Sequence, residues 1–474
     1  MDPTPNRQLP TTVRCHIVAV PFPGRGHINP MMSLCKLIAS KTQDVLITFV
    51  VTEEWFEIIG SNSKPETIRL ASIPNVIPSE QLRGLDFPEF YEAVQTKMKA
   101  PFEQLLDQLE PPVSNIVNDI DLLWATSIGN RRNIPVAILC TTSATFLNKL
   151  QYFSQIEDRD LLVNLLVLIN NSYVYFSRGT GEEDETLNIP EGISPSQVPE
   201  FKNIFYGNAK KGTQLSLLAH SWVPKSQYLL FTSLYELEPQ VFNTLKPKFS
   251  FPLYPIGPAV PPLNSPPNSP QISQWLDSQP TGSVLYVSLG SFVSVSSAQM
   301  DELLGGLKIS GVKFLWVARG ESSRLIKKGE NMNGLIVDWC SSQLGVLCHD
   351  SIGGFLTHCG WNSTLEGLFA GVAMLTFPIM YDQVTNEELI VEGWRVGWRG
   401  RGRVVGDDQS LVSGQEICER VKRFMDEENV EVQNLRKRGR EVREICHRAR
   451  ANGGSSDKNL DAFIKDISQN HYRH

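Results

Sequence analysis

The sequence predicts an α/β protein built from two domains, each with a parallel sheet. Short apolar runs alternate with amphipathic, helix-length stretches through both halves of the chain, and this alternation is typical of parallel sheets with crossover helices. A segment rich in Pro, Ser and Asn, residues 255–270, separates the halves and is typical of a semi-extended linker. We therefore predict an N-terminal domain (1–250), a linker (251–274) and a C-terminal domain (275–474). Whether the last helix returns to the N-terminal domain is left open.

Ten segments are predicted as strands because each is short, apolar and bounded by polar or turn-forming residues. They are 16–21, 45–51, 115–117, 136–139, 228–232, 284–288, 313–317, 334–337, 353–357 and 373–377. Amphipathic periodicity predicts helices over 31–40 and 299–309. Since ligands of such sheets bind outside the carboxyl ends of the strands, the residues that follow the strands are the candidates for a site.

Composition and charge indicate a soluble globular protein. Of the 474 residues, 41% are hydrophobic and 20% charged, which is ordinary for such a protein. A formal net charge of −7 does not favour nucleic-acid binding, and the basic stretch 436–440 is predicted to be a solvated helix face. The eight cysteines have neither metal-site nor disulfide spacing, which favours a reducing compartment. With no apolar run long enough for a signal peptide or a membrane span, we expect a cytoplasmic monomer.

A strand-to-helix turn in the C-terminal half predicts an anion-binding site. Strand 353–357 runs into His358, and a helix is predicted to begin at Asn362 or Ser363, either of which suits the N-cap. Ser363 and Glu366 also have capping-box spacing. A helix N-terminus at the end of a parallel strand offers N–H groups and a positive dipole end to a pyrophosphate. On these residues alone, a helix cap without a ligand remains the alternative.

A second turn of this kind carries a histidine in the N-terminal half. Strand 16–21 leads through a glycine-rich turn to His27, and Asn29 and Pro30 suit an N-cap and a first helical position. The positive end of that helix disfavours an imidazolium, which leaves the ring neutral and able to accept a proton. A structural turn histidine is the alternative on these residues alone.

The segment from Trp339 to Gln383 reads WCSSQLGVLCHDSIGGFLTHCGWNSTLEGLFAGVAMLTFPIMYDQ. It closely resembles the donor-binding signature of the plant family 1 UDP-glycosyltransferases, and the resemblance extends from His16 to the C-terminal helices. It implies the GT-B fold, in which two Rossmann-like domains face each other across a cleft. It also implies a UDP-sugar donor on the C-terminal domain, a small-molecule acceptor on the N-terminal domain, and neither a metal ion nor another cofactor. The final Gln383 resembles the glucose-type ending of the signature.

The resemblance implies roles for individual residues of the C-terminal half. His358, Ser363 and the N–H of Asn362 match pyrophosphate contacts, and Glu366 matches the acid that accepts from both ribose hydroxyls. The other matching positions are Ser291 in a second phosphate loop, Trp339 stacking on uracil, the backbone at Cys340 reading the uracil edge, Gln343 within the signature, and Trp361, Asp382 and Gln383 on the sugar hydroxyls.

In the N-terminal half, PGRGHINP matches the segment that carries the family's catalytic histidine, which is His27 here. Asp119 matches the second catalytic residue by its spacing to Trp124, and it would hold His27 in the right tautomer and stabilise the cation formed. Thr141, after strand 136–139, matches a position that contacts the sugar in relatives. The implied reaction is inverting, with His27 as general base for an acceptor hydroxyl.

Departures from the family pattern leave alternatives open. Three residues separate Trp339 from Gln343 where the family has two, so a UDP-sugar-binding protein with impaired uracil stacking and impaired catalysis is the main alternative. Ala373 stands where the family usually has Pro. The sequence Asp119-Ile-Asp121 is literally the DxD metal motif of the other nucleotide-sugar transferase fold, although three residues carry little weight. A nicotinamide oxidoreductase would need a third glycine at the position of Asn29.

The acceptor is expected to lie in the N-terminal domain, against the variable segments Ser79–Phe90 and Gln151–Lys211. Their aromatic residues indicate a small lipophilic alcohol or phenol, such as a phenolic, a terpenoid or a hormone, although a protein core has the same composition.

Overall fold

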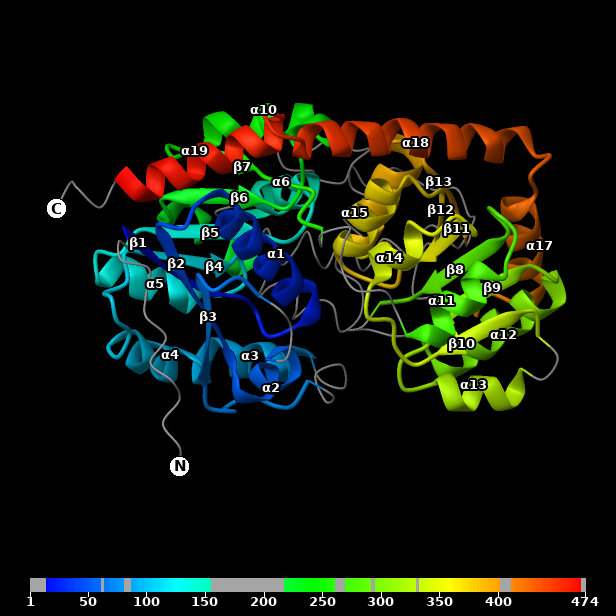
Figure 1. Ribbon diagram of the computed structural model, residues 1–474, viewed down its shortest axis with the longest axis horizontal. Helices are drawn as coiled ribbons and strands as arrows, with labels where there is room; N and C mark the ends of the chain where they lie inside the picture. The colour runs from blue at the N-terminus through cyan, green and yellow to red at the C-terminus, as the bar shows by residue number, and fades with distance from the viewer. Residues whose placement is uncertain are drawn as a thin grey trace, which may run out of the picture. The chain divides into compact units, whose positions relative to one another are not determined.

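The computed structural model describes residues 14–60, 64–80, 87–154, 217–260, 269–290, 295–329, 332–400 and 411–469. The chain divides into two compact units, each with its own parallel sheet (Figure 1). The first unit is drawn from Met1–Ala144, Ala219–Pro261 and Arg448–His474, and the second from Thr145–Leu218 and Pro262–His447.

The first unit contains a seven-stranded sheet with the order β3-β2-β1-β4-β5-β6-β7, in which every neighbouring pair is parallel. Its strands are β1 (Cys15–Val20), β2 (Val45–Thr52), β3 (Ile68–Ile73), β4 (Asn115–Asp119), β5 (Val136–Cys140), β6 (Tyr228–Phe231) and β7 (Leu253–Pro255). Its helices are α1 (Arg25–Lys41), α2 (Glu53–Ile59), α3 (Phe87–Lys97), α4 (Lys99–Leu106), α5 (Leu123–Arg131), α10 (Pro239–Leu245) and α19 (Ser455–Gln469), and the chain leaves the unit at the start of α6 (Ala144–Ser154).

The helix α19 completes the core of this unit. Its residues Leu460, Phe463 and Ile467 are buried in the same apolar cluster as the strands and α1. The Phe463 ring lies 5.8 Å from the rings of both Tyr228 and Tyr254. Segments that lie more than 400 residues apart in the sequence, such as β1 and α19, therefore share one core (Figure 1).

The second unit contains a six-stranded sheet with the order β10-β9-β8-β11-β12-β13, again parallel throughout. Its strands are β8 (Val284–Ser288), β9 (Lys313–Val317), β10 (Gly334–Val337), β11 (Ile352–Thr357), β12 (Met374–Thr376) and β13 (Gly397–Arg399). Its helices are α11 (Pro270–Asp277), α12 (Ser297–Ser310), α13 (Ser322–Lys328), α14 (Gln343–Leu347), α15 (Trp361–Ala370), α16 (Asp382–Glu388), α17 (Gly414–Met425) and α18 (Val430–Arg450). Strand residues pack against α12 and α17 in one buried cluster.

All ten predicted strands are present, with ends that differ by two residues at most. Three further strands, β3, β7 and β13, were not predicted. The predicted linker 251–274 needs correction, because β7 and the beginning of α11 fall inside it, and Ile256, Ala259 and Val260 are buried. Residues 261–268 of that segment lie outside the described residues.

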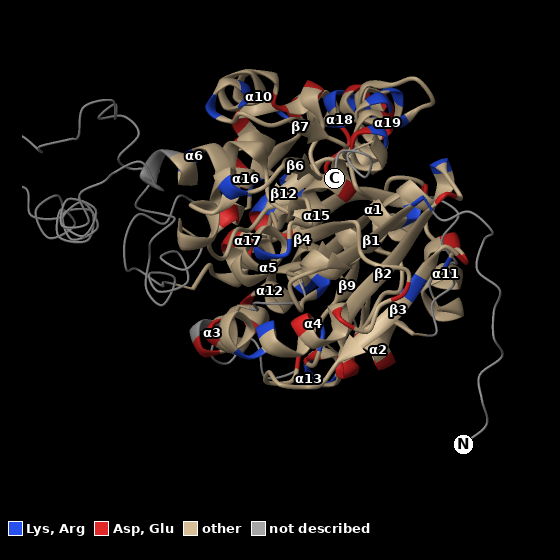
Figure 2. Cartoon of the chain, turned by 90° about the vertical axis from the view of Figure 1, so that its left-hand side faces the viewer, with Lys and Arg blue, Asp and Glu red and all other residues tan. Residues whose placement is uncertain are grey.

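Charged residues of both signs share the C-terminal helices. Figure 2 shows Lys and Arg interspersed with Asp and Glu along α18 and α19, and Arg438 pairs with Glu441 at 2.8 Å within α18. None of the helices in the described ranges combines the length and the apolar character that crossing a membrane requires.

Candidate active site

The sheet order of the first unit brings His27, Asp119 and Thr141 together. Since β1, β4 and β5 are neighbours and parallel, the residues that follow their carboxyl ends meet at one edge of the sheet. His27 lies in the first turn of α1, Asp119 is the last residue of β4, and Thr141 follows β5 directly.

The start of α1 differs from the prediction. The helix begins at Arg25 with Gly24 as its N-cap, so the prediction that Asn29 and Pro30 begin it was wrong, and Pro30 lies inside the helix. The N–H groups of His27 and Ile28 both donate to the carbonyl of Gly24. The helix continues past Pro30 because its apolar residues are buried in the core. This tertiary packing outweighs the low helix propensity of proline.

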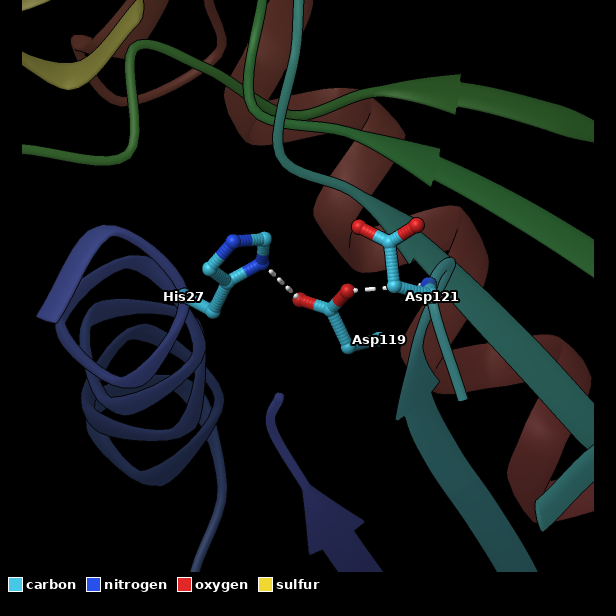
Figure 3. A group of neighbouring side chains, drawn as sticks. All are labelled: His27, Asp119 and Asp121. Carbon is cyan, nitrogen blue, oxygen red and sulfur yellow. Dashed lines mark hydrogen bonds and ion pairs between the residues drawn. The ribbon is translucent and has the colours of Figure 1, made fainter. Parts of the chain in front are cut away.

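The His27 ring is held by two side chains at one nitrogen. Nδ1 lies 2.8 Å from Oδ2 of Asp119 and 3.1 Å from Oγ1 of Thr141. The Asp119 carboxylate is fully buried, whereas the His27 side chain is 27% exposed. A buried carboxylate accepts a hydrogen bond from the Nδ1–H group and so selects the tautomer in which Nε2 is the basic nitrogen. Figure 3 shows this second nitrogen on the side of the ring that faces away from Asp119.

Asp121 brings a second carboxyl group to this site. One ligand atom each from His27, Asp119 and Asp121 lies within 4.8 Å of the others, which is close enough to consider a divalent cation. However, Asp119 already uses Oδ2 for His27 and Oδ1 for the backbone N–H of Asp121 at 3.0 Å. We therefore interpret the three residues as a hydrogen-bonded network, in which Asp121 takes part through its backbone N–H, and we do not assign them as metal ligands (Figure 3).

In the second unit, the N-terminus of α15 lies directly after β11. The helix begins at Trp361 with Gly360 as its N-cap and without a side-chain cap. The prediction that Asn362 or Ser363 caps this helix was therefore wrong. Its first intrahelical bond runs from the N–H of Thr364 to the carbonyl of Gly360, so the N–H groups of residues 361–363 precede the helical ladder. A helix end of this kind favours a bound anion.

His358 lies beside this helix end in a space that two glycines leave open. A Cβ atom at Gly290 would lie 2.5 Å from Nε2 of His358, and one at Gly360 would lie 2.3 Å from it. Burial lowers the pKa of His358 to about 4, although a backbone hydrogen bond at Ser288 opposes the shift, so the ring is neutral at physiological pH. Ser291, which follows Gly290, lies outside the described residues.

Gln343 connects the residues that were expected to contact the ribose and the pyrophosphate. Its Nε2 donates to Oε2 of Glu366 at 2.6 Å and to Oγ of Ser363 at 3.0 Å. Its Oε1 accepts from the hydroxyl of Tyr286 at 3.3 Å. Ser363 and Glu366 thus bind Gln343 rather than forming the expected capping box. Burial raises the pKa of Glu366 to about 7, although the hydrogen bond from Gln343 opposes the rise.

Two backbone N–H groups of the loop before α16 donate hydrogen bonds to the Gln383 side chain. Its Oε1 accepts from the N–H groups of Ile379 and Met380, at 2.8 and 3.1 Å, so Gln383 has its Nε2 for donation to a ligand. Asp382 accepts at Oδ2 from Asn386, which also donates to the carbonyl of Cys359. The turn after β11 and the start of α16 are therefore tied together.

Two tryptophans of the donor signature have different surroundings. Trp361 is only 3% exposed, and its ring centroid lies 6.3 Å from that of Trp394, so a sugar contact from Trp361 would use its main-chain N–H. Trp339 is 44% exposed, and the guanidinium of Arg319 lies 6.0 Å from its ring centroid. Cys340 is buried, and burial raises its pKa to about 12, which keeps the thiol protonated.

The sequence and the fold match those of known glycosyltransferases. Residues 242–399 match the family model described as "UDP-glucoronosyl and UDP-glucosyl transferase". The chain is 45% identical to UDP-glycosyltransferase 87A1 of Arabidopsis thaliana, an alignment that covers 95% of this chain and 100% of that relative. The chain belongs to the plant family 1 UDP-glycosyltransferases.

Solved structures extend this match to the fold. Medicago truncatula UGT71G1, complexed with UDP-glucose, aligns over 96% of this chain and 98% of its own, with a TM-score of 0.74 and 26% identity. Phytolacca americana UGT2, complexed with UDP-2fluoro-glucose and pterostilbene, aligns over 96% and 100%, with a TM-score of 0.70 and 26% identity. This UDP-glycosyltransferase therefore has the predicted GT-B fold, and it transfers a sugar from a UDP-sugar donor.

Some residues that shape the site of this UDP-glycosyltransferase were not predicted. Asn386 follows Asp382 by four residues, which is the spacing of neighbours on a helix surface, so this contact had a sequence signal. Gly290 and Gly360 leave room for His358, but only the three-dimensional position of the ring reveals that requirement.

Proposed function

We propose that this UDP-glycosyltransferase transfers glucose from UDP-glucose to a hydroxyl group of a small lipophilic acceptor, with inversion at the anomeric carbon. The observation that carries the proposal is the bond between Nδ1 of His27 and the buried Asp119 carboxylate, at 2.8 Å. As Nε2 takes the hydroxyl proton, the acceptor oxygen attacks the anomeric carbon, and UDP departs from the opposite face with the electrons of the broken bond. Asp119 stabilises the imidazolium that forms.

The donor part of the proposal rests on the N-terminus of α15. The N–H groups of Asn362 and Ser363, with the neutral His358 ring beside them, would bind the diphosphate, and Glu366 would accept from the ribose hydroxyls. Positive dipole ends and N–H donors stabilise negative charge that grows on a leaving group, so the proposal requires no metal ion. The complex of Medicago truncatula UGT71G1 with UDP-glucose supports glucose as the sugar.

The acceptor part of the proposal rests on the surroundings of His27. The buried ring of Phe22 lies 5.1 Å from His27 and 5.6 Å from the buried Tyr91, so apolar surface adjoins the base. Most of the segments expected to contact the acceptor, residues 81–86 and 155–211, lie outside the described residues. The complex of Phytolacca americana UGT2 with pterostilbene supports a small aromatic acceptor.

A direct assay tests the proposed function. The purified protein is incubated with UDP-glucose and a panel of phenols, terpenoid alcohols and plant hormones, with 2-naphthol as a simple probe. We expect UDP release and a β-linked glucoside, which mass spectrometry and the anomeric proton coupling identify. An α-linked product contradicts inversion. Binding of UDP-glucose without turnover on any panel member supports the alternative of a donor-binding protein with impaired catalysis.

Replacement of Trp339 tests whether the extra residue before Gln343 disturbs uracil binding. The 44% exposure of Trp339 supports a stacking role, because a base can reach a side chain that is not buried. We expect Trp339→Ala to weaken UDP-glucose binding by about 5- to 150-fold, which corresponds to the roughly 1–3 kcal/mol of one base–aromatic stack, with little change in kcat. Isothermal titration measures the change, and Trp339→Phe is the matched control that keeps a ring. Equal affinity of Trp339→Ala and the wild type would show that Trp339 does not stack on uracil.

Replacement of Gln383 by histidine tests donor selection. An imidazole has one acceptor nitrogen, so it cannot accept from both Ile379 and Met380 as the amide oxygen does. We expect Gln383→His to lower kcat/KM for UDP-glucose by about tenfold, the cost of a buried N–H without a partner, with no matching gain for UDP-galactose. Gln383→Glu keeps acceptor oxygens but loses the N–H donor, and so separates loop support from sugar contact. A clean exchange of glucose preference for galactose preference in Gln383→His would contradict this expectation.

A further inference from the structure

Asp121 places a second carboxylate beside the proposed catalytic base. One of its oxygens lies within 4.8 Å of a ring nitrogen of His27 and of an oxygen of Asp119. Asp121 stands two residues beyond Asp119 and is partly buried. Figure 3 shows Asp119 between the other two side chains, so the imidazole lies in the field of two acidic groups.

The position of Asp121 is fixed from two sides. Its own N–H donates to Oδ1 of Asp119 at 3.0 Å, which orients that carboxylate so that Oδ2 faces His27. From α3, the hydroxyl of Tyr91 donates to Oδ1 of Asp121 at 3.3 Å, and the amide of Gln95 donates to its carbonyl oxygen. Tyr91 is 1% exposed, so the carboxylate is held by a buried hydroxyl.

We propose that Asp121 is a positioning residue that raises the basicity of His27 in the transfer reaction. A negative charge within about 4–6 Å favours the protonated form of a neighbouring imidazole, and the imidazolium is the form that proton abstraction creates. Asp121 acts through His27 and through the orientation of Asp119. This inference rests on the proposed role of His27 as general base.

Several other titratable or polar groups lie around His27, and their charge states bear on the effect of Asp121 on the pKa of the ring. Burial raises the pKa of Cys140, at the end of β5, to about 12, so its thiol is neutral. Arg25 is the nearby cation on α1, and it pairs with Glu80 at 3.9 Å and lies over the Trp55 ring. Tyr91 and Thr141 face the network as neutral hydroxyls. Asp119 and Asp121 each place a carboxylate oxygen within 4.8 Å of a ring nitrogen of His27, and the buried Glu238 is a further carboxylate that acts on Cys140.

The test is the pH profile of kcat/KM with UDP-glucose and 2-naphthol, a phenol that stays protonated between pH 5 and pH 8. In Asp121→Asn the imidazolium loses one stabilising charge, so the acidic limb of the profile is expected to move down by roughly 0.5–1 pH unit. A weaker base also transfers the proton more slowly, so the plateau is expected to fall by about 3- to 10-fold. Asp121→Glu keeps the charge and is expected to keep the acidic limb and the plateau of the profile near those of the wild type. Glu57→Gln on the exposed face of α2 removes one equal charge away from the site and is expected to leave both unchanged.

The outcomes separate this inference from the proposed function. An unmoved acidic limb in Asp121→Asn, with or without a uniform loss of rate, overturns the inference and leaves Asp121 with a structural role at most. Asp121→Ser provides a second neutral variant if thermal unfolding shows that Asp121→Asn is poorly folded, and an unmoved limb there has the same meaning. Wild-type turnover in His27→Ala instead overturns the proposed function, whatever the Asp121 variants do.

Discussion

Replacing His27 with alanine is expected to lower kcat by about 10²–10⁴-fold, the usual contribution of general-base catalysis. The acceptor hydroxyl then loses the base that takes its proton, while the groups proposed to bind UDP belong to the second unit and stay in place. The affinity for UDP, measured by isothermal titration, is therefore expected to remain within about twofold of the wild type. Turnover is measured at saturating UDP-glucose with 2-naphthol or the best acceptor of the panel.

Asp119→Asn is the matched variant for this experiment, because it keeps the size of the side chain. Its amide either donates towards Nδ1 or accepts without a charge, so the ring loses the tautomer that exposes a basic Nε2. We expect a loss of kcat of the same order as in His27→Ala, and the double variant is expected to be little worse than either single one, since the two residues act as one unit. Fully additive losses in the double variant, or wild-type kcat in His27→Ala, would contradict the dyad.

Replacing Glu366 with glutamine is expected to weaken UDP-glucose binding by about 10²-fold or more. The proposal gives this carboxylate two ribose hydroxyls as donors, and a hydrogen bond to a charged group is worth about 1.5–3 kcal/mol. The hydrogen bond from Gln343, at 2.6 Å, has an acceptor oxygen in the variant as well, so the cluster is expected to keep its shape. Affinity near that of the wild type would show that the ribose is bound elsewhere.

The same variant is expected to be more stable than the wild type at high pH. Burial raises the pKa of Glu366 from 4.5 to about 7 in the folded chain, so the folded state holds its proton more tightly than the unfolded chain does. Stability therefore falls as the pH rises from about 4.5 to 7, and the cost of the buried charge is fully present above pH 7. Glu366→Gln removes this cost, which corresponds to about 3 kcal/mol at most. Denaturant unfolding at pH 5 and pH 8 is expected to show the gain chiefly at pH 8.

Donor binding by the wild type is expected to release a proton below about pH 7, because the ribose hydroxyls favour the ionised carboxylate. Titration with UDP-glucose, whose diphosphate has no group that titrates in this range, in two buffers of different ionisation enthalpy measures the release. Its absence in Glu366→Gln would assign the proton to Glu366, and equal release in both proteins would contradict the assignment.

Local sequence patterns predicted the strands well because buried parallel strands read as short apolar runs. The three that were missed lack that signal. β3 (Ile68–Ile73) mixes polar and apolar residues, β7 (Leu253–Pro255) lies in a proline-rich stretch, and β13 (Gly397–Arg399) has only three residues. Pairing with a neighbouring strand defines each of them, and that pairing is a tertiary contact.

The order of residues along the chain also predicted which side chains follow the strands, and His27, Asp119 and Thr141 do meet at the edge of the first sheet. The N-caps of α1 and α15 were wrong because Asn29, Asn362 and Ser363 were judged by local propensity alone. In the structure, Gly24 and Gly360 take those positions. The contact between Gln343 and Glu366 spans 23 residues and two elements, so no local pattern could reveal it.

The position of α19 in the first unit has a consequence for how this enzyme is made. Translation produces β1 to β5 first, but the face of the sheet that α1 shares with α19 stays uncovered until residues 455–469 have left the ribosome. During that interval the growing chain presents the apolar partners of Leu460, Phe463 and Ile467 to solvent or to a chaperone. A nascent chain that stalls before α19 is therefore expected to be bound by chaperones through this exposed apolar surface, even though the strands of both sheets have already been synthesised.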